Sequence, residues 1–279
     1  MISRLTGAVF RAILVVILIA TPSLLLPQAG PDSAQVVTLI ALFAAALTLF
    51  EYASAYPGLV EFRDAPPFNR VRFISLFLTV FLLSAICRGK FDPTALTQFL
   101  SAIGSLIGHV IDFPYSPVRL VVLVLPDAAT PAQIDVVRTA AGIAYLTSLL
   151  SLAVFLIVLR LSGWPTANGN FNVWVNLPTF DPTAGGDVVD RLRRDARFNV
   201  VLGFLLPFLI PAAVASAADL FNPISLETPQ TLIWTITAWA FLPASLFMRG
   251  IAMGRVADMI LEKRRQNYVE AEQAGLLPA

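Results

Sequence analysis

Six long apolar runs dominate this sequence and limit what it can fold into. The apolar core of a bilayer is about 30 Å thick, and a helix needs roughly 20 mainly apolar residues to cross it. The third run is slightly short of that length and is expected to borrow residues from its flanks. The sequence therefore predicts an all-α, polytopic membrane protein of about six spans, which are expected at residues 9–26 (read as an uncleaved first span), 36–55, 71–87, 139–161, 198–218 and 231–248.

The composition supports a membrane protein and excludes several kinds of function. Apolar residues make up 57% of the chain and charged residues 13%, whereas soluble domains usually carry about 25% charged residues. A net charge of +1 does not provide the concentrated basic surface that nucleic-acid binding requires. Cys87 is the single cysteine, so an intramolecular disulfide and a cysteine-based metal cluster are excluded. We expect neither a nucleic-acid partner nor a cofactor.

The positions of the basic residues predict the orientation. Cytoplasmic loops of membrane proteins carry an excess of Lys and Arg. With both termini in the cytoplasm, 15 of the 19 basic residues lie inside, and the four outside are Arg88, Lys90, Arg119 and Arg138. Nearly all basic residues are arginines, which is typical of a GC-rich bacterial genome. We therefore expect a multi-pass protein of a bacterial inner (plasma) membrane.

Residues 88–138 form the long external region of this topology. Residues 95–113 have helical spacing and moderate apolarity, whereas the apolar run 118–125 is too short to span a bilayer. We interpret the region as interfacial or re-entrant. The alternative is a paired hairpin that enters the bilayer, which would give eight spans and preserve the sidedness of the other loops.

The polar loop 162–197 begins with an alternating segment, FNVWVNL at residues 171–177. Its period of two predicts a β-strand, but every other element reads as helical, so the strand has no partner within the chain. It would either form a lid over the cytoplasmic helix ends, with Trp164 and Trp174 at the headgroup level, or add to a partner protein. The candidate docking residues are Phe171, Val173, Trp174, Val175 and Leu177.

The second half of the loop, DVVDRLRRDAR, predicts a helix that continues into the fifth span. Asp187 is the expected N-cap. The acid-before-base spacing of four predicts ion pairs from Asp187 to Arg191 and from Asp190 to Arg194. The basic face, with Arg191 and Arg194, would meet a docking partner or anionic lipid.

The C-terminal segment 249–275 predicts an amphipathic helix that continues from the sixth span. Its apolar stripe is expected to rest on the membrane surface or on a partner. The stripe comprises Met253, Val256, Ala257, Ile260 and Leu261.

Three ionisable residues are candidates for chemistry. His109 is the only histidine, and Asp112 follows three residues later on the same helical face. They can serve as a base or a single ligand, but an interfacial structural role is favoured. Glu51 lies at the inner end of the second span, where a carboxylate reaching the headgroups is favoured over a proton relay.

Prolines and glycines indicate how the helices bend and pack. Pro207 and Pro211 fall inside the fifth span and predict kinks, as Pro243 does in the sixth. The pairs Gly104/Gly108 and Gly250/Gly254 have the small-xxx-small spacing that lets helices approach closely.

Two functions are consistent with these features. The first is a non-catalytic membrane subunit, or an assembly or scaffold factor, that docks onto a larger membrane complex; it is favoured because no catalytic motif is present. The second is a small-solute transporter or channel with a path near the kinked fifth and sixth helices. An enzyme acting on lipid is a third possibility and would need His109 and Asp112 to face a shared cleft.

Overall fold

A computed structural model describes residues 2–27, 31–165, 171–181, 183, 185–218 and 226–274. Parts of the predicted loop 162–197, namely residues 166–170, 182 and 184, lie outside the described residues, as does residue 275. Within the described ranges, the elements of regular secondary structure are all helices.

Six of these helices are long and apolar enough to cross a membrane, which indicates a multi-pass membrane protein. Four of the six runs predicted from the sequence lie wholly inside them, and the runs 9–26 and 36–55 extend one and two residues past the ends of their helices. They are α1 (Ile2–Leu25), α2 (Pro31–Ala53), α3 (Phe68–Arg88), α6 (Pro131–Leu161), α8 (Val188–Ala218) and α9 (Pro229–Gln273).

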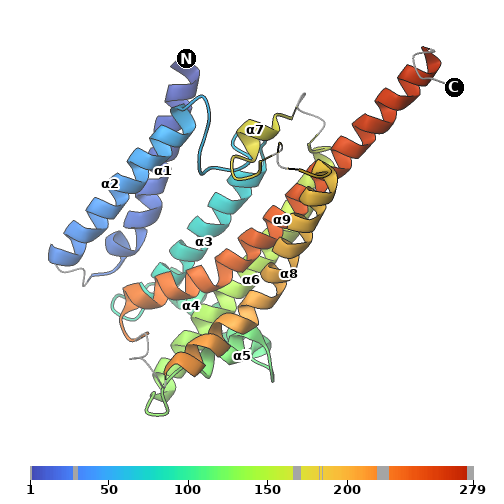
Figure 1. The fold of residues 1–279 in the computed structure, drawn as a ribbon. Helices are drawn as coiled ribbons and strands as arrows, with labels where there is room; N and C mark the ends of the chain where they lie inside the picture. The colour runs from blue at the N-terminus through green and yellow to red at the C-terminus, as the bar shows by residue number, and fades with distance from the viewer. Residues whose placement is uncertain are drawn as a thin grey trace.

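The helices form a central bundle with a hairpin at its side (Figure 1). Helices α3, α6, α8 and α9 pack together, and the α1–α2 hairpin joins them mainly through α1 against α3. The N- and C-termini lie at the same end of the bundle, and α9 projects beyond it (Figure 1). We call this the arginine-rich end, because the starts of α3 and α8 and the middle of α9 bring their arginines there.

The opposite end carries the region 88–138. It forms α4 (Ala95–Ile111) and the short α5 (Pro117–Val122). A Cβ added to Gly108 would lie 2.9 Å from the Arg138 carbonyl oxygen, and one added to Gly142 would lie 2.6 Å from the Gly108 Cα. Helices α4 and α6 therefore touch backbone to backbone, the kind of approach that the Gly104/Gly108 spacing predicts.

Helices α8 and α9 form the most extensive helix pair in the bundle. A Cβ on Gly203 would lie 2.7 Å from the Pro243 carbonyl oxygen, and one on Gly250 would lie 2.6 Å from the Ala196 carbonyl oxygen. A Cβ on Gly254 would meet nothing closer than 3.9 Å. Only the first glycine of the Gly250/Gly254 pair is thus required for close approach.

The predicted continuations of the fifth and sixth spans are confirmed. Helix α8 begins after Asp187, whose carboxylate accepts a hydrogen bond from the Val189 amide at 2.6 Å, and α9 continues unbroken to Gln273. The prediction that the apolar stripe of α9 rests on the membrane surface or on a partner is wrong for Met253, Val256 and Ala257, which are buried within the chain, whereas Ile260 and Leu261 are partly buried. Met253 and Val256 are fully buried in the same core cluster as Leu192 of α8, because α8 extends far enough to cover them.

Candidate functional site

The prediction of a strand at residues 171–177 is wrong. Residues Val173–Asn176 form α7, a single helical turn. The Asn172 side chain accepts hydrogen bonds from the amides of Trp174 and Val175, at 3.0 and 3.4 Å. This cap stabilises a helical turn locally, whereas a strand would have needed a partner to satisfy its ladder.

The five predicted docking residues do not share one face. Leu177 is fully buried, and Phe171 and Val173 pack against the core of the arginine-rich end. Val175 is half-buried, and Trp174 is 57% exposed. Of this set, Trp174 alone presents a large side chain outwards.

Trp174 belongs to a surface patch that also includes residues from the loop between α2 and α3. An open hollow of 540 Å³ lies there, and we call its lining the aromatic patch: Tyr56, Pro57, Asn172, Trp174 and Pro178. Tyr56 is 76% exposed. Tyr56 and Trp174 are 118 positions apart, and no local sequence pattern indicated that they would line the same hollow.

Asn176 fixes the loop beneath the aromatic patch. Its backbone carbonyl accepts a hydrogen bond from the Phe62 amide at 2.6 Å, and its side-chain oxygen accepts one from the Asp64 amide at 3.1 Å. These bonds hold Phe62 in a left-handed conformation, with a φ of 50°, which is unusual for an aromatic residue. The Phe62 ring then packs fully buried against Phe68 and Trp164.

Glu51 organises the start of the same loop. Its carboxylate is buried, and it accepts hydrogen bonds from the amides of Gly58, Leu59 and Val60 at 2.9 to 3.2 Å. Arg63 donates to the carbonyls of Glu51 and Ser54 at 3.1 and 2.6 Å. The residue thus closes a loop, a role that the sequence signal of an isolated acid did not predict.

Glu61 and Arg249 tie this loop to α9. Arg249 donates to both carboxylate oxygens of Glu61, at 2.6 and 2.7 Å, and Thr179 donates to one of them at 2.6 Å. Burial favours the neutral acid, but the hydrogen bonds from Arg249 and Thr179 outweigh it and hold the pKa of Glu61 below its ordinary value. The carboxylate is therefore charged and paired at neutral pH.

The basic face of α8 is partly used within the chain. Arg191 donates to the Asp181 carbonyl at 2.6 Å and lies over the Phe180 ring. Arg194 stays exposed, and its one ion pair among the described residues is with the neighbouring Asp195, at 3.7 Å. Asp187 pairs with Arg264 of α9 at 2.7 Å in place of the predicted Arg191, and its pKa is lowered by the Arg264 hydrogen bond. No ion pair from Asp190 to Arg194 forms between these described residues.

His109 and Asp112 lie at the opposite end and do not form a shared cleft. The Asp112 carboxylate is buried between Arg119 and Arg138, at 2.8 and 2.7 Å. The His109 ring is exposed, with Nδ1 2.8 Å from the Ser105 carbonyl oxygen. The pairing of Asp112 with two arginines from α5 and α6 gives it a structural role that joins three helices.

Pro207 and Pro211 lie within α8. The Trp239 indole donates to the Pro207 carbonyl at 3.0 Å, in a buried position. The cavity beside Pro207 and Pro243 has a volume of only 80 Å³ and a mainly apolar lining. Pro211 lacks the amide that would bond to the Pro207 carbonyl, and Trp239 of α9 satisfies this carbonyl instead.

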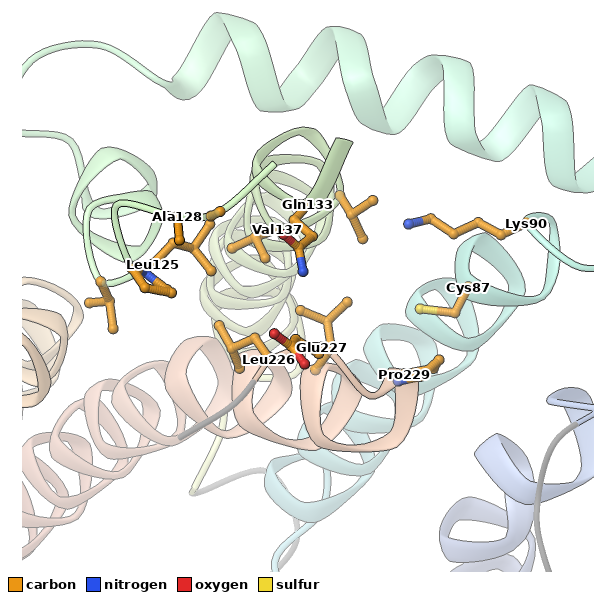
Figure 2. Close-up of a pocket in the computed structure, with 14 residues that line it drawn as sticks. Cys87, Lys90, Leu125, Ala128, Gln133, Val137, Leu226, Glu227 and Pro229 are labelled. Atoms are coloured by element: carbon orange, nitrogen blue, oxygen red, sulfur yellow. The ribbon is translucent and has the colours of Figure 1, made fainter. Parts of the chain in front are cut away.

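A further cavity, of 240 Å³, lies at the opposite end (Figure 2). Its walls are mainly apolar, with Leu125 and Val137 on one side and Leu226 on the other. The polar residues that line it are Lys90, Gln133 and Glu227 (Figure 2). The side-chain oxygen of Gln133 accepts hydrogen bonds from the amide and hydroxyl of Thr130, the N-cap of α6.

No group of three or more His, Cys, Asp or Glu side chains that could hold a metal ion occurs among the described residues. Comparison with known proteins found no matching protein family, curated protein or solved structure.

Proposed function

We propose that this chain is a non-catalytic membrane subunit, or an assembly or scaffold factor, that docks onto a larger membrane protein complex through the aromatic patch. The observation that carries the proposal is the exposure of Trp174 and Tyr56 around an open hollow on a loop with buried polar anchors. Exposed Trp and Tyr are enriched among the residues that dominate protein–protein binding energies.

The rigidity of the patch supports binding of a protein partner. Aromatic residues that only mark the headgroup level need no fixed backbone. Here, Asn176 fixes the loop from one side, Glu51 and Arg63 from the other, and Arg249 from α9. Preorganisation of this kind reduces the entropy that binding would otherwise cost.

The packing of α8 and α9 also supports this proposal over a transport path. A path near Pro207 and Pro211 would need a polar, water-accessible cavity. The direct contact at Gly203 and the mainly apolar 80 Å³ cavity offer no such feature among the described residues.

We further propose that the arginine-rich end faces the cytoplasm of a bacterial cell, with the chain in the inner membrane. The support is the excess of basic residues at this end. In a Cys87→Ser background, a membrane-impermeant maleimide applied to spheroplasts should label Asp127→Cys directly. It should label Arg194→Cys only after permeabilisation, and the reverse pattern would contradict the orientation.

The docking proposal is tested by mild-detergent purification of the tagged chain from its native membranes, with quantitative mass spectrometry. Identified membrane proteins should co-purify with the wild type and fall about tenfold or more with Trp174→Ala, since a hot-spot truncation costs about 2 kcal/mol or more. Phe91→Ala, an exposed aromatic at the opposite end, should retain them. Recovery of the wild type as a lone monomer in several detergents would overturn the proposal.

A further inference from the structure

A larger cavity, of 600 Å³, lies between the α1–α2 hairpin and the start of α3, at the arginine-rich end. This volume is within the range of pockets that hold small ligands. It is distinct from the aromatic patch, and its lining comes from α1, α2, α3 and the loop before α3.

One end of this cavity is cationic. Arg11, Arg63 and Arg70 line it, and no carboxylate does so among the described residues. Arg63 is engaged by Asp64 and by loop carbonyls. Among the described residues, Arg11 donates a hydrogen bond only to the Gly7 carbonyl, and it lies over the Tyr52 ring at 4.5 Å. Arg70 is exposed and makes no ion pair with a described residue.

Two further features add positive potential at this end. Arg72 lies over the Phe68 ring at 4.9 Å, and its Nε is buried without a hydrogen-bond partner among the described residues. Helix α3 begins here at Phe68 with no side-chain cap on its amides. A helix N-terminus carries a partial positive charge that favours anions.

The other end of the cavity is apolar and lies deeper in the bundle. Leu14 and Val15 follow Arg11 along α1 by three and four residues, and Ile74 follows Arg70 along α3 by four. This spacing keeps each set on the same helix face, one turn (about 5 Å) further along. Both helices run inwards from the arginine-rich end, so the cavity passes from cationic to apolar with depth.

We propose that this cavity binds an anionic phospholipid, with its headgroup phosphate on Arg11 and Arg70 and an acyl chain along Leu14, Val15 and Ile74. Basic pockets between transmembrane helices recognise anionic headgroups, and only a lipid also satisfies the apolar inner wall. The bound lipid would bridge the hairpin to α3, because α2 itself packs almost only on α1.

The test uses native mass spectrometry of the delipidated full-length chain with added phosphatidylglycerol or phosphatidylcholine. One phosphatidylglycerol should bind in preference to phosphatidylcholine. Arg70→Gln and Arg11→Gln should each weaken that binding about fivefold. Arg160→Gln, which removes an exposed arginine at the same end but outside the cavity, should leave it unchanged. Equal binding of the two lipids, or equal effects of Arg70→Gln and Arg160→Gln, would overturn the proposal.

A second variant separates a lipid from free phosphate. Val15→Trp fills the apolar end and leaves all three cavity arginines in place, so it should abolish phosphatidylglycerol binding. Retention of phosphatidylglycerol by Val15→Trp, or displacement of the lipid by inorganic phosphate alone, would contradict a lipid site. Because Arg70 is exposed, the Arg70→Gln chain should keep the helical content of the wild type, which circular dichroism measures. A folded Arg70→Gln chain with undiminished lipid binding would also contradict a lipid site.

Discussion

Arg249 in α9 holds both carboxylate oxygens of Glu61, which lies 188 residues earlier, at 2.6 and 2.7 Å. Among the described polar contacts that fix the loop under the aromatic patch, this bidentate pair joins the two residues that are furthest apart in the sequence. Arg suits this geometry because its planar guanidinium offers parallel donors to a carboxylate. The loop therefore depends on α9 for its position.

Glu61→Gln should destabilise the protein by about 2 to 3 kcal/mol, because it leaves Arg249 with a weakened partner in a mostly buried site. The free energy of unfolding, measured by denaturant titration in detergent, checks this. Arg193→Gln breaks an exposed ion pair with Asp258 and should cost less than about 1 kcal/mol. Equal costs for the two variants would contradict the account.

The same pair makes stability depend on pH. The pKa of Glu61 is lowered in the folded protein, and in the unfolded chain it is near the ordinary value of about 4.3. The stabilisation is therefore fully present above about 4.3 and is lost as the pH falls through the lowered folded value. The slope of unfolding free energy against pH in this acidic window should be shallower in Glu61→Gln. An unchanged slope would show that Glu61 is not the titrating group.

Gly250 and Gly254 offer a matched pair on one helix. Gly250→Ala should destabilise the protein by about 1 to 3 kcal/mol, because the added Cβ would lie 2.6 Å from the Ala196 carbonyl oxygen. Gly254→Ala has open space and should be neutral or stabilising, by up to about 1 kcal/mol, since alanine favours helix over glycine. Thermal unfolding of both variants tests the α8–α9 contact. A Gly250→Ala variant that is more stable than Gly254→Ala would contradict the close approach at Gly250.

Glu51→Ala should loosen the loop between α2 and α3. Its carboxylate accepts hydrogen bonds from three consecutive amides, and hydrogen bonds to charged groups contribute about 1.5 to 3 kcal/mol each. Hydrogen exchange at residues 58–60 should become about tenfold faster or more. Glu262→Ala, an exposed acid on α9, should leave these amides unchanged, and unaltered exchange in Glu51→Ala would contradict the role assigned to Glu51.

The sequence predicted the long helices well because their signal is local. Runs of apolar residues of membrane-spanning length need no tertiary information, and each of the six corresponds to a long helix to within two residues at its end. The continuation of α8 from its Asp187 cap and of α9 beyond its span was also predictable. Both depend on capping and helical periodicity within a few residues.

The candidate site was harder to predict because it depends on contacts between distant segments. The alternation in FNVWVNL suggested a strand, but Asn172 competed as a helix cap, and the asparagine-rich composition was the available sign of this. Asp112 pairs with Arg138, 26 residues later, on another helix. The partners of Glu61 lie 118 and 188 residues away in the sequence, and no local sequence pattern predicts such pairs.

The most direct test of the docking proposal is photo-crosslinking from position 174. A photoreactive amino acid replacing Trp174 in native membranes should form a crosslink to an identified membrane protein. The same residue at Phe43, an exposed position on α2, serves as the lipid-facing control. A specific protein adduct at position 174 and its absence at position 43 would support docking through the aromatic patch. Lipid adducts alone at both positions would contradict it.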